Sequence, residues 1–231
     1  MQQPSKRPNL LTGHLLLLLA GLAALGSLAT NIILPAFPQM AGELHTTVKD
    51  LSATLASFFI AFAVGQLFVG PLSDRFGRKW LVLSGLMVFV AGSALCAFAD
   101  SLSQLIVGRI VQALGVCATS VLSRAIARDL FEGEALARAL SLIMVAMAAA
   151  PGFSPLLGGA LNSALGWRST FGMVAFLAVL LGMRYWSQLG ETHGADKRAP
   201  LSVAAILKTY GELLLDRRFI APALSVSLVI G

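Results

Sequence analysis

Long apolar stretches alternate with short polar segments along residues 1–188 of the chain. A helix needs about 20 predominantly apolar residues to cross the hydrocarbon core of a bilayer. Six stretches meet this requirement, and they cover residues 13–35, 51–70, 80–99, 102–123, 139–161 and 168–188. None of them alternates apolar and polar residues with the period of two that a membrane β-barrel strand requires. The pattern therefore predicts an all-α membrane protein, with a six-helix transmembrane bundle in residues 1–188.

The rest of the chain is predicted to leave the bilayer and then approach it again. Residues 189–218 are the longest polar segment, which we interpret as a loop on the cytoplasmic side. Within it, the residues after Pro200 fit an amphipathic helix on the membrane surface, and they fit a solvated connector equally well. Residues 219–231 are apolar but too short to cross, as expected for the beginning of a seventh span.

The first apolar stretch has an alternative interpretation. Lys6 and Arg7 precede it, and a basic end followed by an apolar run and small residues is typical of a secretory signal peptide. The apolar run continues through Ile32 and Leu34, however, and five more spans follow. This continuation favours an uncleaved first transmembrane helix.

Composition and the placement of charge support a membrane protein over a nucleic-acid-binding protein. Hydrophobic residues make up 57% of the chain and charged residues only 12%, with a mean hydropathy of +0.81; soluble domains are about 25% charged. Of the 17 Lys and Arg residues behind the net charge of +6, only Lys49 and Arg168 fall in predicted outer loops, and Arg109 falls within a span. Because basic residues concentrate in cytoplasmic loops, this distribution predicts a cytoplasmic N-terminus and explains the charge without a nucleic-acid partner.

Residues that support catalysis or metal binding are few and scattered. Cys96 and Cys117 both lie inside apolar runs, which favours small-residue packing over a disulfide or metal site. The histidines, His14, His45 and His193, are far apart in the sequence, and no phosphate-binding loop is present. The sequence therefore predicts neither an enzyme nor an ATP-driven pump, and no cofactor.

Residues 70–79, Gly-Pro-Leu-Ser-Asp-Arg-Phe-Gly-Arg-Lys, form a charged segment between the second and third spans. We expect a tight cytoplasmic turn in which Gly70 and Gly77 permit unusual backbone geometry and close helix approach. A carboxylate at such a helix junction can face a helix dipole or accept hydrogen bonds from arginine, which makes Asp74 a candidate gate residue. Arg75 and Arg78 are expected either to pair with acids at the end of the fourth span, or to anchor the topology. The candidate acids are Asp129 and Glu132.

Arg109 is the one charge placed well inside a span. A buried arginine is costly in hydrocarbon, so it is expected to face the bundle interior or a watery cavity. Gln112 lies three residues further on and hence on the same face, and Gly115 follows near that stripe. The alternative is that the Arg109 side chain extends to the outer membrane interface.

The fifth predicted span contains helix-breaking and small residues, namely Pro151, Ser154, Pro155, Gly158 and Gly159. Proline removes backbone hydrogen bonds and glycine permits close helix packing. This span is therefore expected to bend and pack tightly, although a purely structural kink fits the pattern as well.

Several stretches together resemble the major facilitator superfamily, in particular its drug:proton antiporters of the bicyclomycin/chloramphenicol-resistance type. The resemblance rests on the segment at 70–79, on Leu34-Pro-Ala-Phe-Pro38, Arg109-Ile-Val-Gln-Ala-Leu-Gly115 and Ser154-Pro-Leu-Leu-Gly-Gly159, and on Arg124-Ala-Ile-Ala-Arg-Asp-Leu130. It implies a twelve-helix fold in two six-helix halves around a central substrate cavity. The chain would supply the first half and the start of helix 7, as a fragment or a truncated product.

The resemblance also implies a function and residue roles. It implies export of a small amphipathic drug or metabolite across the bacterial inner membrane in exchange for protons. Asp74 would help to close the cytoplasmic side against a partner in the second half, and Arg109 would serve proton coupling or cavity electrostatics. The motif in the fifth span would limit leak and shape the conformational change.

Two departures from the family pattern leave alternatives open. Asn31 stands where the branch usually has an acid, and none of the 11 acidic residues lies in the middle of a span. An amide cannot carry a proton in the relevant pH range, so Asn31 is expected to bind substrate or to join neighbouring helices. Ser154 stands where the fifth-span motif prefers glycine. A metabolite exporter or importer of the same superfamily therefore remains open, as does a non-transporting remnant or an assembly partner.

Overall fold

The structure, a computed structural model, describes residues 9–192 and, from residue 13 onward, their side chains. This part of the chain is helical throughout, apart from short connections. Its elements are α1 (Asn9–Asn31), the 3₁₀ turn η1 (Leu34–Ala36), α2 (Phe37–Glu43), α3 (Val48–Phe76), α4 (Arg78–Ala97), α5 (Leu102–Leu130), α6 (Gly133–Leu165) and α7 (Arg168–Gln188).

Six segments of the described chain are long and apolar enough to cross a membrane. They are Gly13–Glu43, which combines α1, η1 and α2, and the five helices α3 to α7. The predicted all-α architecture with six spans is thus confirmed. The loop and seventh apolar stretch predicted beyond Thr192 lie outside the described residues, as do Lys6 and Arg7.

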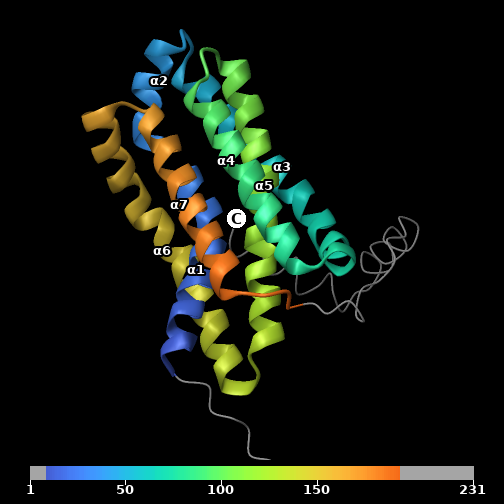
Figure 1. The fold of residues 1–231 in the computed structure, drawn as a ribbon. Coiled ribbons are helices and arrows are strands. Elements are labelled where there is room, and N and C mark those ends of the chain that lie inside the picture. The colour runs from blue at the N-terminus through green and yellow to red at the C-terminus, as the bar shows by residue number, and fades with distance from the viewer. Residues whose placement is uncertain (1–8, 193–231) are drawn as a thin grey trace, which may run out of the picture. The chain divides into compact units, whose positions relative to one another are not determined.

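The helices run alternately up and down, so successive connections lie at opposite ends of the bundle (Figure 1). α5 packs against α3, α4 and α1, while α1 also packs against α6, and α7 lies along α4. α1 and α5 are the most buried helices, and α3 and α6 are the most exposed. The interior of the bundle is therefore built mainly around α1 and α5, which positions Arg109 of α5 away from lipid.

Small residues allow α4 and α5 to pack closely. A Cβ at Gly85 would lie 2.7 Å from the Gly115 carbonyl oxygen, and a Cβ at Gly108 would lie 2.7 Å from Cys96 Sγ. Cys96 packs against Gly108 in this contact, and Cys117 packs in the same way against Gly65 of α3, as expected for small-residue packing. Close backbone approach through small residues is the usual way for membrane helices to gain packing energy, because lipid provides no hydrophobic driving force between them.

The turn expected at residues 70–79 is much shorter in the structure than predicted. α3 continues to Phe76 with Pro71 inside it, and α4 begins at Arg78, so Gly77 alone joins the two helices. Gly77 has φ 89° and ψ 159°, a backbone conformation that is essentially restricted to glycine. Gly70 is helical and a Cβ there would meet open space, so it supports no close approach within the described residues.

Candidate functional site

The Arg109 side chain is fully buried between three helices. Its exposed fraction is 0%, and its Nη1 donates hydrogen bonds to Gln112 Oε1 at 2.5 Å and to the Ala29 carbonyl oxygen of α1 at 3.2 Å. The guanidinium carbon lies 4.2 Å from the centroid of the Phe58 ring of α3. A desolvated cation over an aromatic face is stabilised by about 2 kcal/mol. Of the two alternatives, the structure therefore places Arg109 in the bundle interior and not at the outer interface.

Gln112 extends the contacts of Arg109 to α4. Its Nε2 donates to Ser93 Oγ at 2.8 Å, and the Ser93 hydroxyl donates to the Phe89 carbonyl oxygen at 2.8 Å. All the side chains that make these hydrogen bonds are buried. We name the set of Arg109, Gln112, Ser93 and Phe58 the arginine network.

The charge of Arg109 has no counter-ion among residues 13–192. No carboxylate of that part of the chain lies within ion-pair distance of Arg109, and its Nε and Nη2 have no hydrogen-bond partner there. Removing a charge from water costs several kcal/mol unless a partner or hydrogen bonds compensate. The arginine network therefore holds an incompletely compensated positive charge at a position deep within a span.

Asn31 and Gly115 do not join this network. The Asn31 amide donates to the Ser27 carbonyl oxygen at 2.7 Å and to Thr30 Oγ1 at 3.3 Å, both in its own helix. Gly115 lies instead against α4, where a Cβ would lie 2.6 Å from the Gly85 carbonyl oxygen. Gly115 thus serves helix packing in this structure, and the half-buried Asn31 makes no hydrogen bond to the guanidinium.

A second polar cluster joins three helix ends around Gly77. Arg78 Nε lies 2.5 Å from Asp129 Oδ2 at the end of α5, and the pair is partly buried. Thr192 Oγ1 donates to the same Asp129 oxygen at 3.2 Å. The expected pairing of Arg78 with Asp129 is therefore present, and it ties the start of α4 to the end of α5.

Glu191 caps the first turn of α4 from the far end of the described chain. Its carboxylate accepts hydrogen bonds from the backbone N–H of Arg78 at 2.8 Å and of Lys79 at 3.3 Å. Gly77, as the N-cap residue of α4, has no side chain with which to do this. A carboxylate at a helix N-terminus satisfies otherwise unpaired N–H groups and interacts favourably with the helix dipole. The sequence pattern gives no sign of this role, because Glu191 and Arg78 are distant in the sequence.

The other residues of the 70–79 segment lie apart from this cluster. Asp74 is exposed, and its side chain makes no hydrogen bond or ion pair within residues 13–192. The Arg75 guanidinium lies 5.4 Å from the Phe76 ring centroid, and no acid of the described part pairs with it. Of the two acids expected at the end of α5, only Asp129 has an arginine partner within the described residues.

The proline and glycine motif lies in α6, which remains helical through Pro151 and Pro155. Gly158 makes the closest approach, because a Cβ there would overlap the carbonyl oxygen of Ile32 just after α1. Gly159 faces Pro35 more loosely, since a Cβ added at Gly159 would lie 3.8 Å from the Pro35 side chain. The Ser154 hydroxyl is buried and bonds the Ala150 carbonyl oxygen in its own helix.

A third cluster, at the opposite end of the bundle from Gly77, was not anticipated. Arg168 Nη1 lies 2.5 Å from Glu43 Oε2, and Trp167 Nε1 donates to the same oxygen at 2.8 Å. Arg168 also lies 3.7 Å from Asp100. A glycine closely followed by arginine recurs at Gly77 and Gly166, but the same pattern lies inside helices at Gly108 and Gly182, so it does not identify the cluster from sequence.

Comparison with known proteins identifies the family. Residues 19–231 match the family described as the Major Facilitator Superfamily. The chain belongs to this superfamily. Its members are membrane transporters and not enzymes, which confirms the prediction that the chain is not an enzyme.

The similar curated proteins are bacterial transporters and resistance proteins. The chain is 37% identical to the uncharacterized MFS-type transporter YdgK of Bacillus subtilis, covering 93% of this chain and 54% of YdgK. It is 32% identical to multidrug resistance protein D of Escherichia coli (79% and 46% covered). It is 30% identical to the bicyclomycin resistance protein homolog of Haemophilus influenzae (84% and 49% covered). The chain thus spans about half the length of the curated relatives it matches.

Solved structures agree in fold. The human organic anion transporter MFSD10 aligns with a TM-score of 0.65 at 20% identity, covering 87% of this chain and 53% of that one. A bacterial homolog of the human lysosomal transporter Spinster aligns with a TM-score of 0.68 at 17% identity, covering 85% and 45%. The six-helix bundle is therefore one half of a Major Facilitator Superfamily fold.

Proposed function

We propose that this chain is the N-terminal half of a proton-coupled efflux transporter of the bicyclomycin/chloramphenicol-resistance type. The complete protein exports small amphipathic drugs or metabolites across a bacterial inner membrane by alternating access. The names of the resistance-protein relatives support the substrate class. The observation that carries the coupling role is the buried, incompletely compensated charge of Arg109.

A buried guanidinium without a counter-ion among the described residues suits a coupling step. Its positive charge disfavours the binding of a cation nearby and favours the binding of an anion. A proton or substrate that changes the local charge therefore changes the stability of the surrounding helix arrangement. Because the arginine network touches α1, α3 and α4 from α5, such a change reaches all four helices.

The proposed orientation places the Gly77 end in the cytoplasm. Most basic residues of the described bundle lie toward this end, namely Arg75, Arg78, Lys79, Arg124, Arg128, Arg138 and Arg184. Lys49 and Arg168 lie toward the other end. This asymmetry supports the orientation through the preference of basic residues for cytoplasmic loops. Asp74, exposed at this end, is then the residue available to the second half when the cytoplasmic side closes.

A metabolite exporter or importer of the same superfamily is the second candidate. The observation that favours it is the amide at Asn31, together with the lack of a carboxylate near Arg109 in the described part of the chain. Without a membrane-embedded acid in this half, a cationic drug has no obvious partner here, whereas Arg109 suits an anion.

The decisive experiment expresses the complete gene in an efflux-deficient bacterium and measures susceptibility to a panel of drugs. Increased tolerance of amphipathic drugs that disappears with Arg109→Ala supports drug efflux. In inverted vesicles, transport should follow an imposed pH gradient in the wild type and lose that dependence in Arg109→Ala. Transport of an anionic metabolite without any change in drug tolerance would favour the second candidate.

A further inference from the structure

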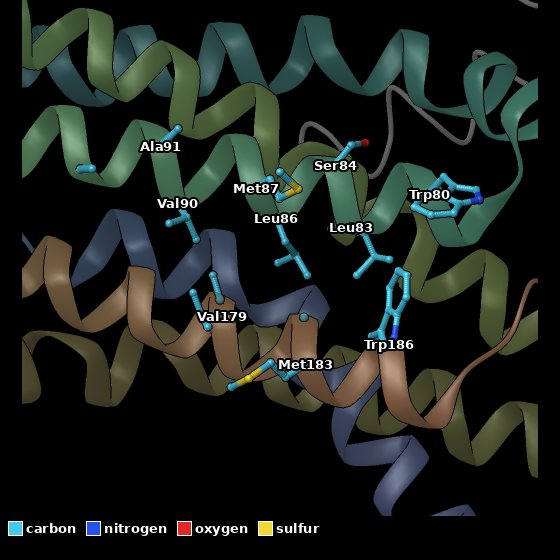
Figure 2. A pocket seen from close by; sticks show the side chains of 13 residues that line it. Trp80, Leu83, Ser84, Leu86, Met87, Val90, Ala91, Val179, Met183 and Trp186 are labelled. Carbon is cyan, nitrogen blue, oxygen red and sulfur yellow. The ribbon is translucent and has the colours of Figure 1, made fainter.

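An apolar groove of about 750 Å³ runs between α4 and α7 on the surface of the bundle. Figure 2 shows Leu83, Leu86 and Val90 of α4 facing Val179 and Met183 of α7 across it. Ser84 is the only hydroxyl-bearing residue in its lining, and that hydroxyl already donates to the Leu81 carbonyl oxygen. Apart from the two tryptophans at one end, the lining offers no polar group in need of a partner, so the groove suits a hydrocarbon chain better than a polar solute.

The groove is long enough to hold an acyl chain over the depth of one leaflet. Its lining runs from Trp80 to Ala94, a rise of about 21 Å along α4 at 1.5 Å per residue. One leaflet of a bilayer contributes about 15 Å of the 30 Å hydrocarbon core. Met87 and Met183, which are 73% and 57% exposed, border the groove with flexible side chains that adapt to a mobile chain.

The end of the groove near Gly77 has the chemistry of a lipid headgroup site. Trp80 and Trp186 meet there edge to face, with ring centroids 5.8 Å apart (Figure 2). Both rings are more than half exposed, and neither indole N–H donates a hydrogen bond within residues 13–192. Tryptophan is enriched where hydrocarbon meets the headgroups, because its ring is apolar and its N–H is polar.

A positive charge lies at this same end. Lys79 Nζ is 4.5 Å from the Trp186 ring centroid, and no carboxylate of the described chain forms an ion pair with it. The neighbouring Arg78 is already paired with Asp129. Among the described residues, Lys79 is thus a cation without an ion-pair partner at the polar end of an apolar groove, which complements an anionic headgroup with a hydrocarbon tail.

We propose that the α4/α7 groove binds an anionic phospholipid from the leaflet at the Gly77 end of the bundle. One acyl chain lies in the groove, the two tryptophans border the glycerol region, and Lys79 contacts the phosphate. Binding there bridges α4 and α7, which are also joined where Glu191, just after α7, caps α4.

Quenching of tryptophan fluorescence by brominated lipids tests this site in the full-length protein. The protein is reconstituted in vesicles of phosphatidylcholine with an increasing fraction of either dibrominated phosphatidylglycerol or dibrominated phosphatidylcholine. We expect phosphatidylglycerol to associate about fivefold more tightly, since one lysine near the surface contributes about 1 kcal/mol toward an anionic lipid. The double variant Trp80→Phe/Trp186→Phe should lose this headgroup-dependent part of the quenching.

Matched variants separate the parts of the site. Lys79→Gln should bring the ratio of phosphatidylglycerol to phosphatidylcholine association close to one. Lys49→Gln, at the other end of the bundle, should leave this ratio unchanged. Ala91→Phe, which fills the groove from an exposed position, should weaken quenching by both lipids, in contrast to Val145→Phe on the exposed face of α6. Equal association of the two lipids in the wild type overturns the proposal, as does a preference that survives Lys79→Gln. If neither brominated lipid quenches the fluorescence of Trp80 and Trp186, the proposal is also overturned, because protein would then cover the groove.

Discussion

Gly77 and Gly166 adopt nearly the same backbone conformation at opposite ends of the bundle. Gly77 joins α3 to α4 with φ 89° and ψ 159°, and Gly166, followed by Trp167, joins α6 to α7 with φ 80° and ψ 165°. Both pairs of angles lie in a region that is essentially restricted to glycine. A glycine of this kind thus lies where the chain reverses its direction between two long helices.

An arginine closely follows each of these glycines and pairs with an acid that lies near the end of another span. Arg78 pairs with Asp129 of α5, and Arg168 pairs with Glu43 of α2, both with a closest nitrogen-to-oxygen distance of 2.5 Å. The two three-helix parts of the bundle thus carry equivalent joints at opposite ends. This arrangement agrees with the inverted three-helix repeats nested in each half of this superfamily.

Replacement of the joint glycines should destabilise the bundle. Gly77→Ala and Gly166→Ala each force a Cβ into the disfavoured backbone region, at a cost of about 1–3 kcal/mol. Gly70→Ala is the control, since Gly70 is helical with open space at its Cβ position and alanine favours helix by about 1 kcal/mol. The measurement is the thermal unfolding midpoint of the purified protein in detergent. Midpoints for Gly77→Ala at or above that of Gly70→Ala contradict the role of the joint.

The Arg78–Asp129 pair should show measurable coupling. Because both side chains are partly buried, a double-mutant cycle with Arg78→Gln and Asp129→Asn should give a coupling free energy of about 0.5–3 kcal/mol. The exposed pair Arg138–Glu134, four residues apart on α6, provides the comparison and should give about 0.3–0.5 kcal/mol. A coupling energy no larger than that of the exposed pair would show that Arg78 only anchors the helix end.

Neutralisation of Glu191 should weaken the start of α4. Glu191→Gln removes the negative charge that faces two backbone N–H groups but keeps an amide oxygen that can accept a hydrogen bond, so we expect a loss of about 0.3–1 kcal/mol in unfolding free energy. Glu132→Gln is a suitable control, because Glu132 precedes α6 without a side-chain capping bond. Amide hydrogen exchange at Arg78 and Lys79 should accelerate in Glu191→Gln. Unchanged exchange at both amides would contradict the cap.

Asp74→Asn should separate stability from transport. The Asp74 side chain is exposed and has no hydrogen bond in residues 13–192, so the substitution should leave membrane insertion and the unfolding midpoint unchanged. If Asp74 closes the cytoplasmic side against the second half, drug efflux by the complete protein should nevertheless be lost. Wild-type efflux in this variant would rule out the gating role, and a lowered midpoint would show instead that the residue supports the fold.

Much of the architecture was predictable from composition and periodicity. Six apolar stretches must be helices in lipid, because only a helix satisfies its own backbone hydrogen bonds there. The same reasoning predicted that Arg109 avoids hydrocarbon, either in the bundle interior or at the outer interface, and the structure places it in the interior. Helix ends were less predictable: Asp74 and Arg75 are polar but remain in the last turn of α3, because a helix can extend beyond the hydrocarbon into the interface.

The partners of these residues depended on tertiary packing. The amino-acid sequence by itself determined an all-α membrane bundle, the placement of Arg109 along a span and the asymmetry of its basic residues, because hydropathy and charge act locally along the chain. Only the three-dimensional arrangement decided that Phe58 covers Arg109, that Glu191 caps α4 and that Gly158 meets Ile32. Those contacts depend on how each helix is rotated and where it crosses its neighbours, and these are set by packing between residues far apart in the sequence.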